Sequence, residues 1–374
     1  MAGPLDGITV VDLSTVIAGP YASQMLGDFG ARIIKVEPPG GDIMRAPGPA
    51  RSPGMGAAFL NCNRNKESRV LDLKNLADLN RLLALLDGSD VLLHNMRPRA
   101  IGRLGLKFET LHARNPRLIH CSVVGYGQEG PYRDRPAYDD VIQAEAGWAD
   151  LYARTGGVPR YAPTIAADKI TGLHAAAAIN AALLARTVSG IGQAVEVPMF
   201  ETMVSFLAVE HLAGCSFRPP LGPTGYDRLL APHRRPYETR DGHVCAMPYT
   251  GTHWRAFFTA VGRTEWAEDP ALASDANRAA MIGVLYERLA ACLLLETTSH
   301  WLNLLRRLDI PCAQVNSLDA MLEDEHLKAV GLFQTMRHPT EGEVVTARSP
   351  ITFSGTPCTI GHLAPPLGRG GVGA

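Results

Sequence analysis

Short apolar runs and helical patterns alternate along the first 200 residues. Runs typical of buried strands cover 5–13, 31–37, 68–73, 90–94, 118–124 and 193–197. Stretches with apolar residues at helical spacing lie between them, at about 18–29, 76–86, 100–104 and 108–113. Strands that alternate with helices pair in parallel through right-handed crossovers, so we expect a doubly wound, Rossmann-like α/β domain.

The longest helical pattern begins near Asp168 and continues to about Arg186. It is rich in Ala and Leu, which favour helices, and Gly190 and Gly192 end it. Small or apolar residues occupy nearly every face, which is typical of a helix buried between other elements. Asp168 lies at the helix N-terminus, where unpaired N–H groups and the helix dipole favour a negative charge. Its carboxylate is either a cap or an ionised nucleophile, and position alone leaves both interpretations open.

The composition changes after residue 215, and 374 residues are too many for one ordinary core. We therefore expect a second, smaller α+β domain. Its predicted elements are a Pro- and Gly-rich linker at 218–225, two short strands within 237–247 and helices at about 252–261, 278–295 and 298–308. Strand-like segments follow at 344–346 and 351–353.

Charge and cysteine content exclude several classes of function. A net charge of −1 gives no general attraction to nucleic acid or to an anionic membrane, and no stretch is apolar enough to span a bilayer. The seven cysteines are scattered and form no Cys-x-x-Cys pair, and the histidines form no His-Glu-x-x-His motif. We expect reduced thiols, no metal site and a cytoplasmic location.

The ends of the predicted strands carry the candidate ligand-binding residues. Lys74, Arg97, Arg99 and Arg103 follow strands there, where ligands of open α/β sheets bind, and basic side chains suit phosphate groups. The turn after the first strand, 14–20, lacks a Gly-x-Gly-x-x-Gly pattern, which disfavours a nicotinamide or flavin enzyme of the usual type.

Many short motifs, in order and over nearly the whole chain, resemble the class III coenzyme A transferases. This CaiB/BaiF family also contains formyl-CoA transferase and α-methylacyl-CoA racemase. The motifs are Leu5-Asp-Gly-Ile-Thr-Val-Val-Asp-Leu13, Ala18-Gly-Pro20, Gly27-Asp-Phe-Gly-Ala-Arg-Ile-Ile-Lys-Val-Glu37, Gly41-Asp42, Asn61-Cys-Asn-Arg-Asn-Lys66, Leu71-Asp-Leu-Lys74, Asn95-Met-Arg-Pro98, Arg103-Leu-Gly105, Ser122-Val-Val-Gly-Tyr-Gly127, Asp168 with its helix, Leu308-Asp-Ile-Pro311 and Ala364-Pro-Pro-Leu-Gly368.

The resemblance implies an interlaced homodimer whose chains each have a large and a small domain. The large, CoA-binding domain would be discontinuous, with 1–215 and 331–374, and the small domain would cover 225–325. Linkers would occupy 216–224 and 326–330. Acyl-CoA and a carboxylic acid would be the substrates, with no permanently bound cofactor.

The resemblance also implies a set of site residues. Asp168 falls on the family's catalytic aspartate. CoA contacts fall on Ile17, Ala18, Leu71, Lys74, Asn95, Met96, Arg103, Leu104 and Tyr138. Two basic residues of the family are replaced here by Pro38 and Pro136, and Arg45, Arg97 or Arg133 are candidates to take over their role.

Three functions remain to be compared. In a CoA transferase, the Asp168 carboxylate would attack the donor thioester and pass through anhydride and aspartyl-CoA intermediates. The racemase branch needs a Gly-His-Asp triplet, and this chain has Ala137-Tyr-Asp139, which makes racemisation less favoured because tyrosine is a poor base near neutral pH. A non-catalytic CoA-binding protein would not need Asp168.

Overall fold

The computed structural model describes residues 3–369, which form two compact units. The first unit comprises 3–148, 161–206 and 325–369. The second comprises 149–160 and 207–324. Each unit has a hydrophobic core of its own, and the first has one core on each face of its main sheet.

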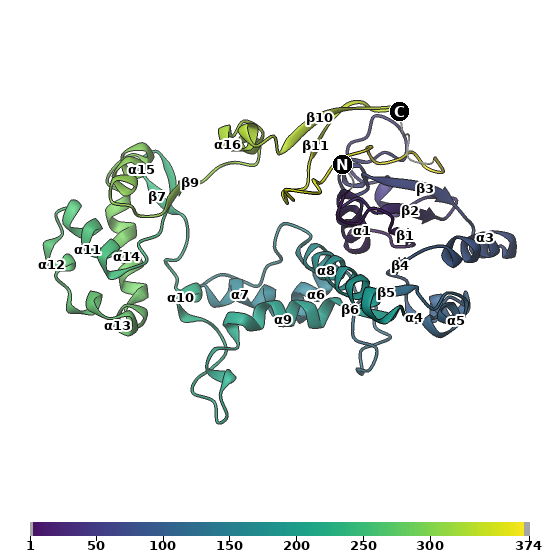
Figure 1. Ribbon diagram of the computed structural model, residues 1–374. Helices are drawn as coiled ribbons and strands as arrows, with labels where there is room; N and C mark the ends of the chain where they lie inside the picture. The colour runs from purple at the N-terminus through teal and green to yellow at the C-terminus, as the bar shows by residue number, and fades with distance from the viewer. Residues whose placement is uncertain (1–2, 370–374) are drawn as a thin grey trace. The chain divides into compact units, whose positions relative to one another are not determined.

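A six-stranded parallel sheet in the order β3-β2-β1-β4-β5-β6 forms the centre of the first unit (Figure 1). Its strands are β1 (Thr9–Asp12), β2 (Arg32–Glu37), β3 (Lys66–Val70), β4 (Val91–His94), β5 (Ile119–Val124) and β6 (Ala194–Pro198). The predicted mixed α/β fold with a parallel sheet is confirmed, although the third strand begins two residues earlier than the apolar pattern suggests. Strand order reverses between β1 and β4, which places a crevice at their carboxyl ends.

Helices cover both faces of this sheet because successive residues of each strand point in opposite directions. Val10 joins the core under one group of helices, and its neighbour Val11 joins the core under the other. The first group is α1 (Ala18–Asp28), α6 (Asp139–Glu145), α8 (Ala166–Ser189) and α9 (Met199–His211). The second group is α3 (Leu76–Asp87), α4 (Pro98–Arg103) and α5 (Phe108–Arg114).

Helix α8 packs closely on α1 along one face only. A Cβ atom on Gly172 would lie 2.6 Å from the carbonyl oxygen of Ala18, so only glycine permits this approach. The opposite face is open within the chain: the exposed fractions are 69% for Leu184 and 89% for Val188, and His174 is also exposed. The expectation of a helix buried between other elements holds for the side of α8 that packs on α1, but not for this side, which no other described element of the first unit covers.

The C-terminal segment of the first unit begins with a helix and a hairpin, α16 (Glu325–Ala329), β10 (Phe333–His338) and β11 (Gly342–Ala347). It then follows β3, where Ser68 accepts a hydrogen bond from the N–H of Gly368 and donates one from its own N–H to Arg369. The predicted strand at 351–353 is wrong. Phe353 packs edge-on against Phe29 instead, and no described strand pairs with the segment.

The second unit is a smaller α+β body built on an antiparallel sheet in the order β7-β8-β9. The strands are β7 (Tyr237–Thr239), β8 (Gly242–Ala246) and β9 (Cys312–Gln314). The helices are α10 (Asp227–Leu230), α11 (Gly251–Ala260), α12 (Thr264–Ala267), α13 (Asp275–Ala280), α14 (Ile282–Leu293) and α15 (Thr298–Arg307). The single helix predicted at 278–295 is in fact α13 and α14, which Met281 separates.

Other short helices were not evident from the sequence pattern. They are α2 (Ala57–Cys62) and α7 (Trp148–Arg154), with 3-10 turns at Ile43–Arg45, Ala213–Ser216, Pro270–Ala273 and Asp319–Leu322. All seven cysteines are free thiols. Between residues 3 and 369, no helix is both long and apolar enough to cross a membrane.

Candidate active site

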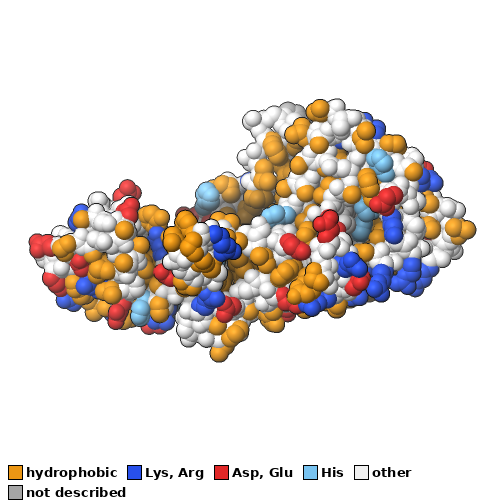
Figure 2. Space-filling model, turned by 90° about the horizontal axis from the view of Figure 1, so that it is seen from below, with side chains coloured by type: hydrophobic (Ala, Val, Ile, Leu, Met, Phe, Trp, Pro, Cys, Tyr) orange, Lys and Arg blue, Asp and Glu red, His pale blue; other side chains and the backbone are white. Residues whose placement is uncertain are grey.

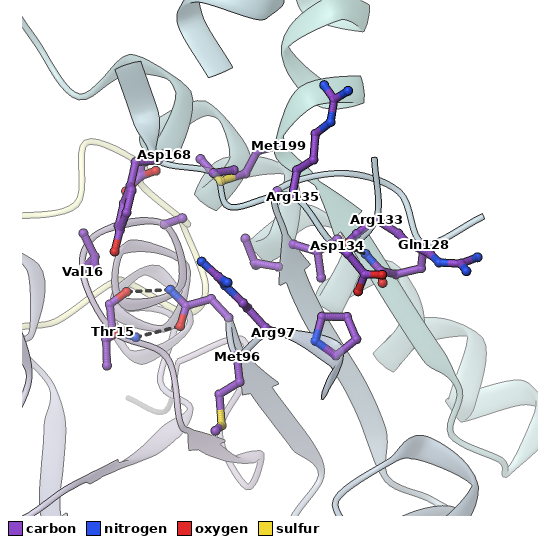
Figure 3. A pocket seen from close by; sticks show the side chains of 18 of the residues that line it. Thr15, Val16, Met96, Arg97, Gln128, Arg133, Asp134, Arg135, Asp168 and Met199 are labelled. Atoms are coloured by element: carbon purple, nitrogen blue, oxygen red, sulfur yellow. Dashed lines mark hydrogen bonds between the residues drawn. The ribbon is translucent and has the colours of Figure 1, made fainter. Parts of the chain in front are cut away.

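A hollow opens at the carboxyl ends of β1 and β4, where the strand order reverses. The loops after these strands are tied together because the side-chain amide of Asn95 accepts from the N–H of Thr15 at 3.0 Å and donates to its carbonyl at 2.8 Å (Figure 3). The hollow has a volume of about 310 Å³. We call it the basic hollow; its lining residues include Thr15, Val16, Ala18, Asn95, Met96, Arg97, Arg99, Gln128, Arg133, Arg135, Tyr138, Asp168 and Met199.

Asp168 lies at this hollow as the third residue of α8, with an exposed fraction of 7%. It does not cap its own helix, because Ile165 occupies the N-cap position. Instead, the N–H of Asp168 donates to Oδ1 of Asp139 at 3.0 Å. Asp139 lies in the first turn of α6, and its side chain caps the start of α8.

The surroundings of Asp168 weaken its acidity. Burial and the nearby Asp139 carboxylate raise the pKa of Asp168 to about 6, and a hydrogen bond from the backbone N–H of Ala18 acts in the opposite direction. A carboxylate with this pKa is largely ionised at neutral pH yet poorly solvated. Such a group is suited to nucleophilic attack, since it has little hydration to lose.

A second hollow of about 430 Å³ also has Asp168 among its lining residues. We call it the acidic hollow; it is lined by Val16, Tyr138, Asp139, Asp140, Ala162, Pro163, Thr164, Ile165 and Asp168. No described Lys or Arg lines it, although the ammonium group of Lys169 donates to the Thr164 hydroxyl at 2.6 Å. Val16, Tyr138 and Asp168 belong to both hollows, so the carboxylate lies where a basic and an acidic space meet.

The four arginines of the basic hollow differ in their partners. Arg99 pairs with Asp134 at 3.0 Å, and Arg135 stacks on the ring of Tyr132. Arg97 and Arg133 form no ion pair with any described residue of the chain. In Figure 3, Arg97 extends between Thr15 and Arg135, with Asp168 on one side and Arg133 on the other.

Exposed basic side chains are concentrated on α4, α5 and the loops beside them. They are Arg97, Arg99, Arg103, Lys107, Arg114 and Arg117. Figure 2 shows Lys and Arg side chains gathered at the right of the view, over the part of the first unit that carries these helices in Figure 1. The combination of unpaired arginines in the hollow and basic side chains around α4 favours a long ligand with several negative charges.

The structure brings together half of the residues predicted for the site. Ala18, Asn95, Met96, Tyr138 and Asp168 line the basic hollow. The others do not line it: they are Ile17, Leu71, Lys74, Arg103 and Leu104. Ile17 and Leu71 are buried, whereas Lys74 and Arg103 are exposed.

Arg45 cannot substitute for the basic residues that the family has at the positions of Pro38 and Pro136. Its guanidinium is buried and makes two hydrogen bonds of 2.7 Å to the carboxylate of Glu37. This candidate is therefore wrong. The other two, Arg97 and Arg133, lie in the basic hollow and remain candidates.

Sequence reasoning missed Thr15, Val16 and Arg135 as lining residues. The signal available for Thr15 and Val16 was their position directly after the first strand of a doubly wound sheet. Arg135 gave only a weak signal, because its loop carries several charges. Among the described residues, no histidine lines either hollow, and no group of three His, Cys, Asp or Glu side chains within 3–369 is arranged to hold a metal ion.

Comparisons with known proteins agree with one another. The family model described as CoA-transferase family III matches residues 5–370. The chain is 32% identical to a succinate–glutarate CoA-transferase of Agrobacterium fabrum, over 98% of this chain and 93% of that protein. It is 30% identical to a formyl-CoA:oxalate CoA-transferase of Afipia carboxidovorans, over 99% and 92%. A crystal structure of a CAIB/BAIF family protein from Brucella suis superposes with a TM-score of 0.83, at 30% identity over 98% and 97% of the two chains.

Proposed function

The chain belongs to CoA-transferase family III, and on that basis we propose that it moves coenzyme A from an acyl-CoA donor to a carboxylic acid with Asp168 as the covalent nucleophile. The observation that carries the proposal is the buried carboxylate at the junction of a basic and an acidic hollow. The phosphates of CoA are assigned to the arginines of the basic hollow. The acyl group and the acceptor acid are assigned to the acidic hollow.

The proposed cycle begins when a carboxylate oxygen of Asp168 attacks the thioester carbonyl. The new C–O bond forms, the C–S bond breaks, and CoA leaves as a thiolate from a mixed anhydride. The thiolate then attacks the Asp168 carbonyl carbon, which releases the donor acid and leaves an aspartyl-CoA thioester. The N–H of Ala18, which donates to the Asp168 carboxylate, would stabilise the oxyanion that develops when the thiolate attacks this carbonyl.

The second half of the cycle reverses these steps with a different acid. The acceptor carboxylate attacks the aspartyl-CoA thioester and displaces CoA thiolate, which gives a new anhydride. The thiolate attacks the acceptor's carbonyl carbon, and the product acyl-CoA leaves as Asp168 returns to its carboxylate form. Because the thioester energy is carried through covalent intermediates, the cycle requires neither ATP nor a bound metal.

Racemisation is less well supported. The position of the racemase histidine is taken by Tyr138, which is 67% exposed, and no described histidine lines either hollow. The two activities are separated by one pair of assays. A transferase forms new acyl-CoA when free acids are added, whereas a racemase incorporates deuterium from solvent at the α-carbon of a 2-methylacyl-CoA. Deuterium incorporation without transfer would overturn the proposal, and absence of both activities would favour a non-catalytic CoA-binding protein.

We further propose that the protein is a homodimer. The exposed side of α8, with Leu173, Leu184 and Val188, is an apolar surface that a second copy would cover. Light scattering on the purified protein tests this proposal directly, since a monomeric mass would contradict it. The interlaced arrangement, the domain limits inferred from the family resemblance and a cytoplasmic location stay predictions.

A further inference from the structure

The turn between β1 and α1 is held by side chains from other segments. The Nζ of Lys35, on β2, donates to the carbonyl of Ser14 at 2.9 Å. The N–H of Val16 donates to Oδ1 of Asp42 at 3.2 Å. Together with the two hydrogen bonds between Asn95 and Thr15, these contacts fix three consecutive residues of the turn, Ser14, Thr15 and Val16. Ile17 and the first residue of α1 follow directly.

Asp42 is the centre of this arrangement. It has an exposed fraction of 1%, and its Oδ1 accepts from the N–H groups of both Val16 and Met44. Its Oδ2 lies 2.9 Å from the Nζ of Lys35, which is wholly buried. The N–H of Asp42 donates to Glu37 at 2.9 Å. A carboxylate bound on both oxygens and on its own backbone has one orientation available, so it holds the turn firmly.

Val16 needs such support because its backbone is strained. Its φ angle is +69°, in the left-handed region that β-branched residues seldom adopt. Strain of this kind costs about 1–3 kcal/mol and persists only where the surroundings impose it. The strained residue lines both hollows beside Asp168.

The conformation of Val16 also sets where α1 begins. Ala18, two residues later, lines the basic hollow together with Asp168, and its carbonyl lies against Gly172, one turn along α8 from Asp168. A relaxed Val16 would redirect the chain immediately before Ile17 and Ala18. The N–H of Ala18 would then no longer be aimed at the Asp168 carboxylate.

We propose that Asp42, held by Lys35, is a positioning residue that keeps Val16 in its left-handed conformation and thereby aligns the start of α1 with Asp168 for acyl transfer. The inference rests on the proposed function, since acylation of Asp168 is the step it serves. Asp42 itself touches no substrate in this scheme: it lies under the turn and acts through the backbone.

The test compares two double variants that differ in whether residue 42 offers an oxygen acceptor to the N–H groups of Val16 and Met44. Lys35→Met/Asp42→Asn removes both buried charges and retains an Oδ1 acceptor. Lys35→Met/Asp42→Leu removes the charges and the acceptor and keeps a side chain that branches at Cγ. In single-turnover acylation of Asp168 by acyl-CoA, we expect the Leu variant to be about 10- to 100-fold slower than the Asn variant. The Kd for CoA should differ by less than about 3-fold between the two variants, because the lost acceptor affects the transition state of acylation and not the binding of CoA.

A rescue experiment separates positioning from general damage to the fold. Val16→Gly, added to the Leu variant, lets the backbone adopt a positive φ without strain and should restore most of the acylation rate. Val16→Ala, the control, should not restore it, because alanine is also strained at this angle. Equal acylation rates for the Asn and Leu variants, or equal rescue by Gly and Ala, would overturn the inference.

Hydrogen exchange supplies a readout that does not depend on catalysis. The amides of 14–18 should lose protection in the Leu variant and keep it in the Asn variant. Unchanged protection in the Leu variant would overturn the inference even if no acylation were found. A wild-type protein that is never acylated at Asp168, but shows this difference in protection, would contradict the proposed function and leave the role of Asp42 in shaping the turn standing.

Discussion

The backbone N–H of Asp168 donates to the side chain of Asp139 at 3.0 Å, so the proposed nucleophile is held by a second carboxylate. The Asp168 carboxyl is buried, and the negative charge of Asp139 also opposes its ionisation; together these two causes raise the pKa of Asp168 to about 6. Asp139 therefore has two effects: its hydrogen bond fixes the start of α8, and its charge adds to burial in making Asp168 a stronger base than a solvated aspartate.

The first expected outcome concerns pH. Because Asp168 must be ionised to attack, kcat/KM should fall as the pH drops through about 6. Asp139→Asn keeps an oxygen acceptor for the Asp168 N–H but removes the charge, so the acidic limb should move to lower pH. Asp140→Asn is the matched control, since Asp140 is exposed and is not among the groups that shift the pKa of Asp168. An acidic limb that moves equally in both variants would show that the Asp139 charge is not responsible.

A second prediction concerns CoA binding by the arginines of the basic hollow that form no ion pair with a described residue. Arg133→Ala should raise the KM for acyl-CoA by about 10-fold, the effect of removing one charge-assisted hydrogen bond. Arg99→Ala should have a smaller effect, because that guanidinium already pairs with Asp134. Steady-state kinetics at fixed ionic strength measures both. If Arg99→Ala proved the more damaging change, the assignment of the phosphates to the unpaired arginines would be wrong.

The charges of the acidic hollow bear on the choice of acid. Asp139 and Asp140 line it, so a second carboxylate on the acceptor would meet like charges there. We expect kcat/KM for a monocarboxylic acid such as butanoate to exceed that for butanedioate by about 10-fold or more. Asp140→Asn removes one of these charges and should therefore reduce the ratio of the two kcat/KM values. If the wild-type protein preferred the dicarboxylic acid, the assignment of the acyl group and the acceptor acid to the acidic hollow would be wrong.

Stability should depend on His94, a buried histidine at the end of β4 that lines neither hollow. Burial lowers the pKa of His94 to about 3, far below the ordinary 6.5, so the unfolded chain binds the proton more tightly than the folded one. The stabilisation is present above pH 6.5 and is lost as the pH falls towards 3, by about 1.4 kcal/mol per pH unit. His94→Gln should flatten the dependence of unfolding free energy on pH between about 6.5 and about 5. His243→Gln, at an exposed position of the second unit and away from α8, should leave this pH dependence unchanged; identical slopes in the two variants would contradict the assignment.

Patterns that repeat locally were sufficient for the main sheet and its helices. The strands follow from short apolar runs, and the helix that begins near Asp168 follows from its high content of Ala and Leu. The limits of α13 and α14 did not follow, because the break at Met281 has no Gly or Pro to mark it.

The site was only partly accessible to sequence reasoning. Asp168 and Asn95 could be named from motifs, but the contact between Asp168 and Asp139 joins residues 29 positions apart and has no local signal. The left-handed conformation of Val16 could not be predicted either, because valine rarely adopts a positive φ and its neighbours in the sequence do not indicate one. Arg45 misled for the same reason: its partner Glu37 could be identified only once the loop after β2 was folded.

Covalent labelling of the protein by acyl-CoA tests the central claim most directly. The wild-type protein is incubated with acyl-CoA, the anhydride or thioester is trapped with hydroxylamine, and the modified peptide is identified by mass spectrometry beside that of Asp168→Asn. We expect modification at Asp168 in the wild type, and neither modification nor CoA transfer in the variant. Undiminished transfer by Asp168→Asn, or an adduct on another residue in the wild type, would contradict the account.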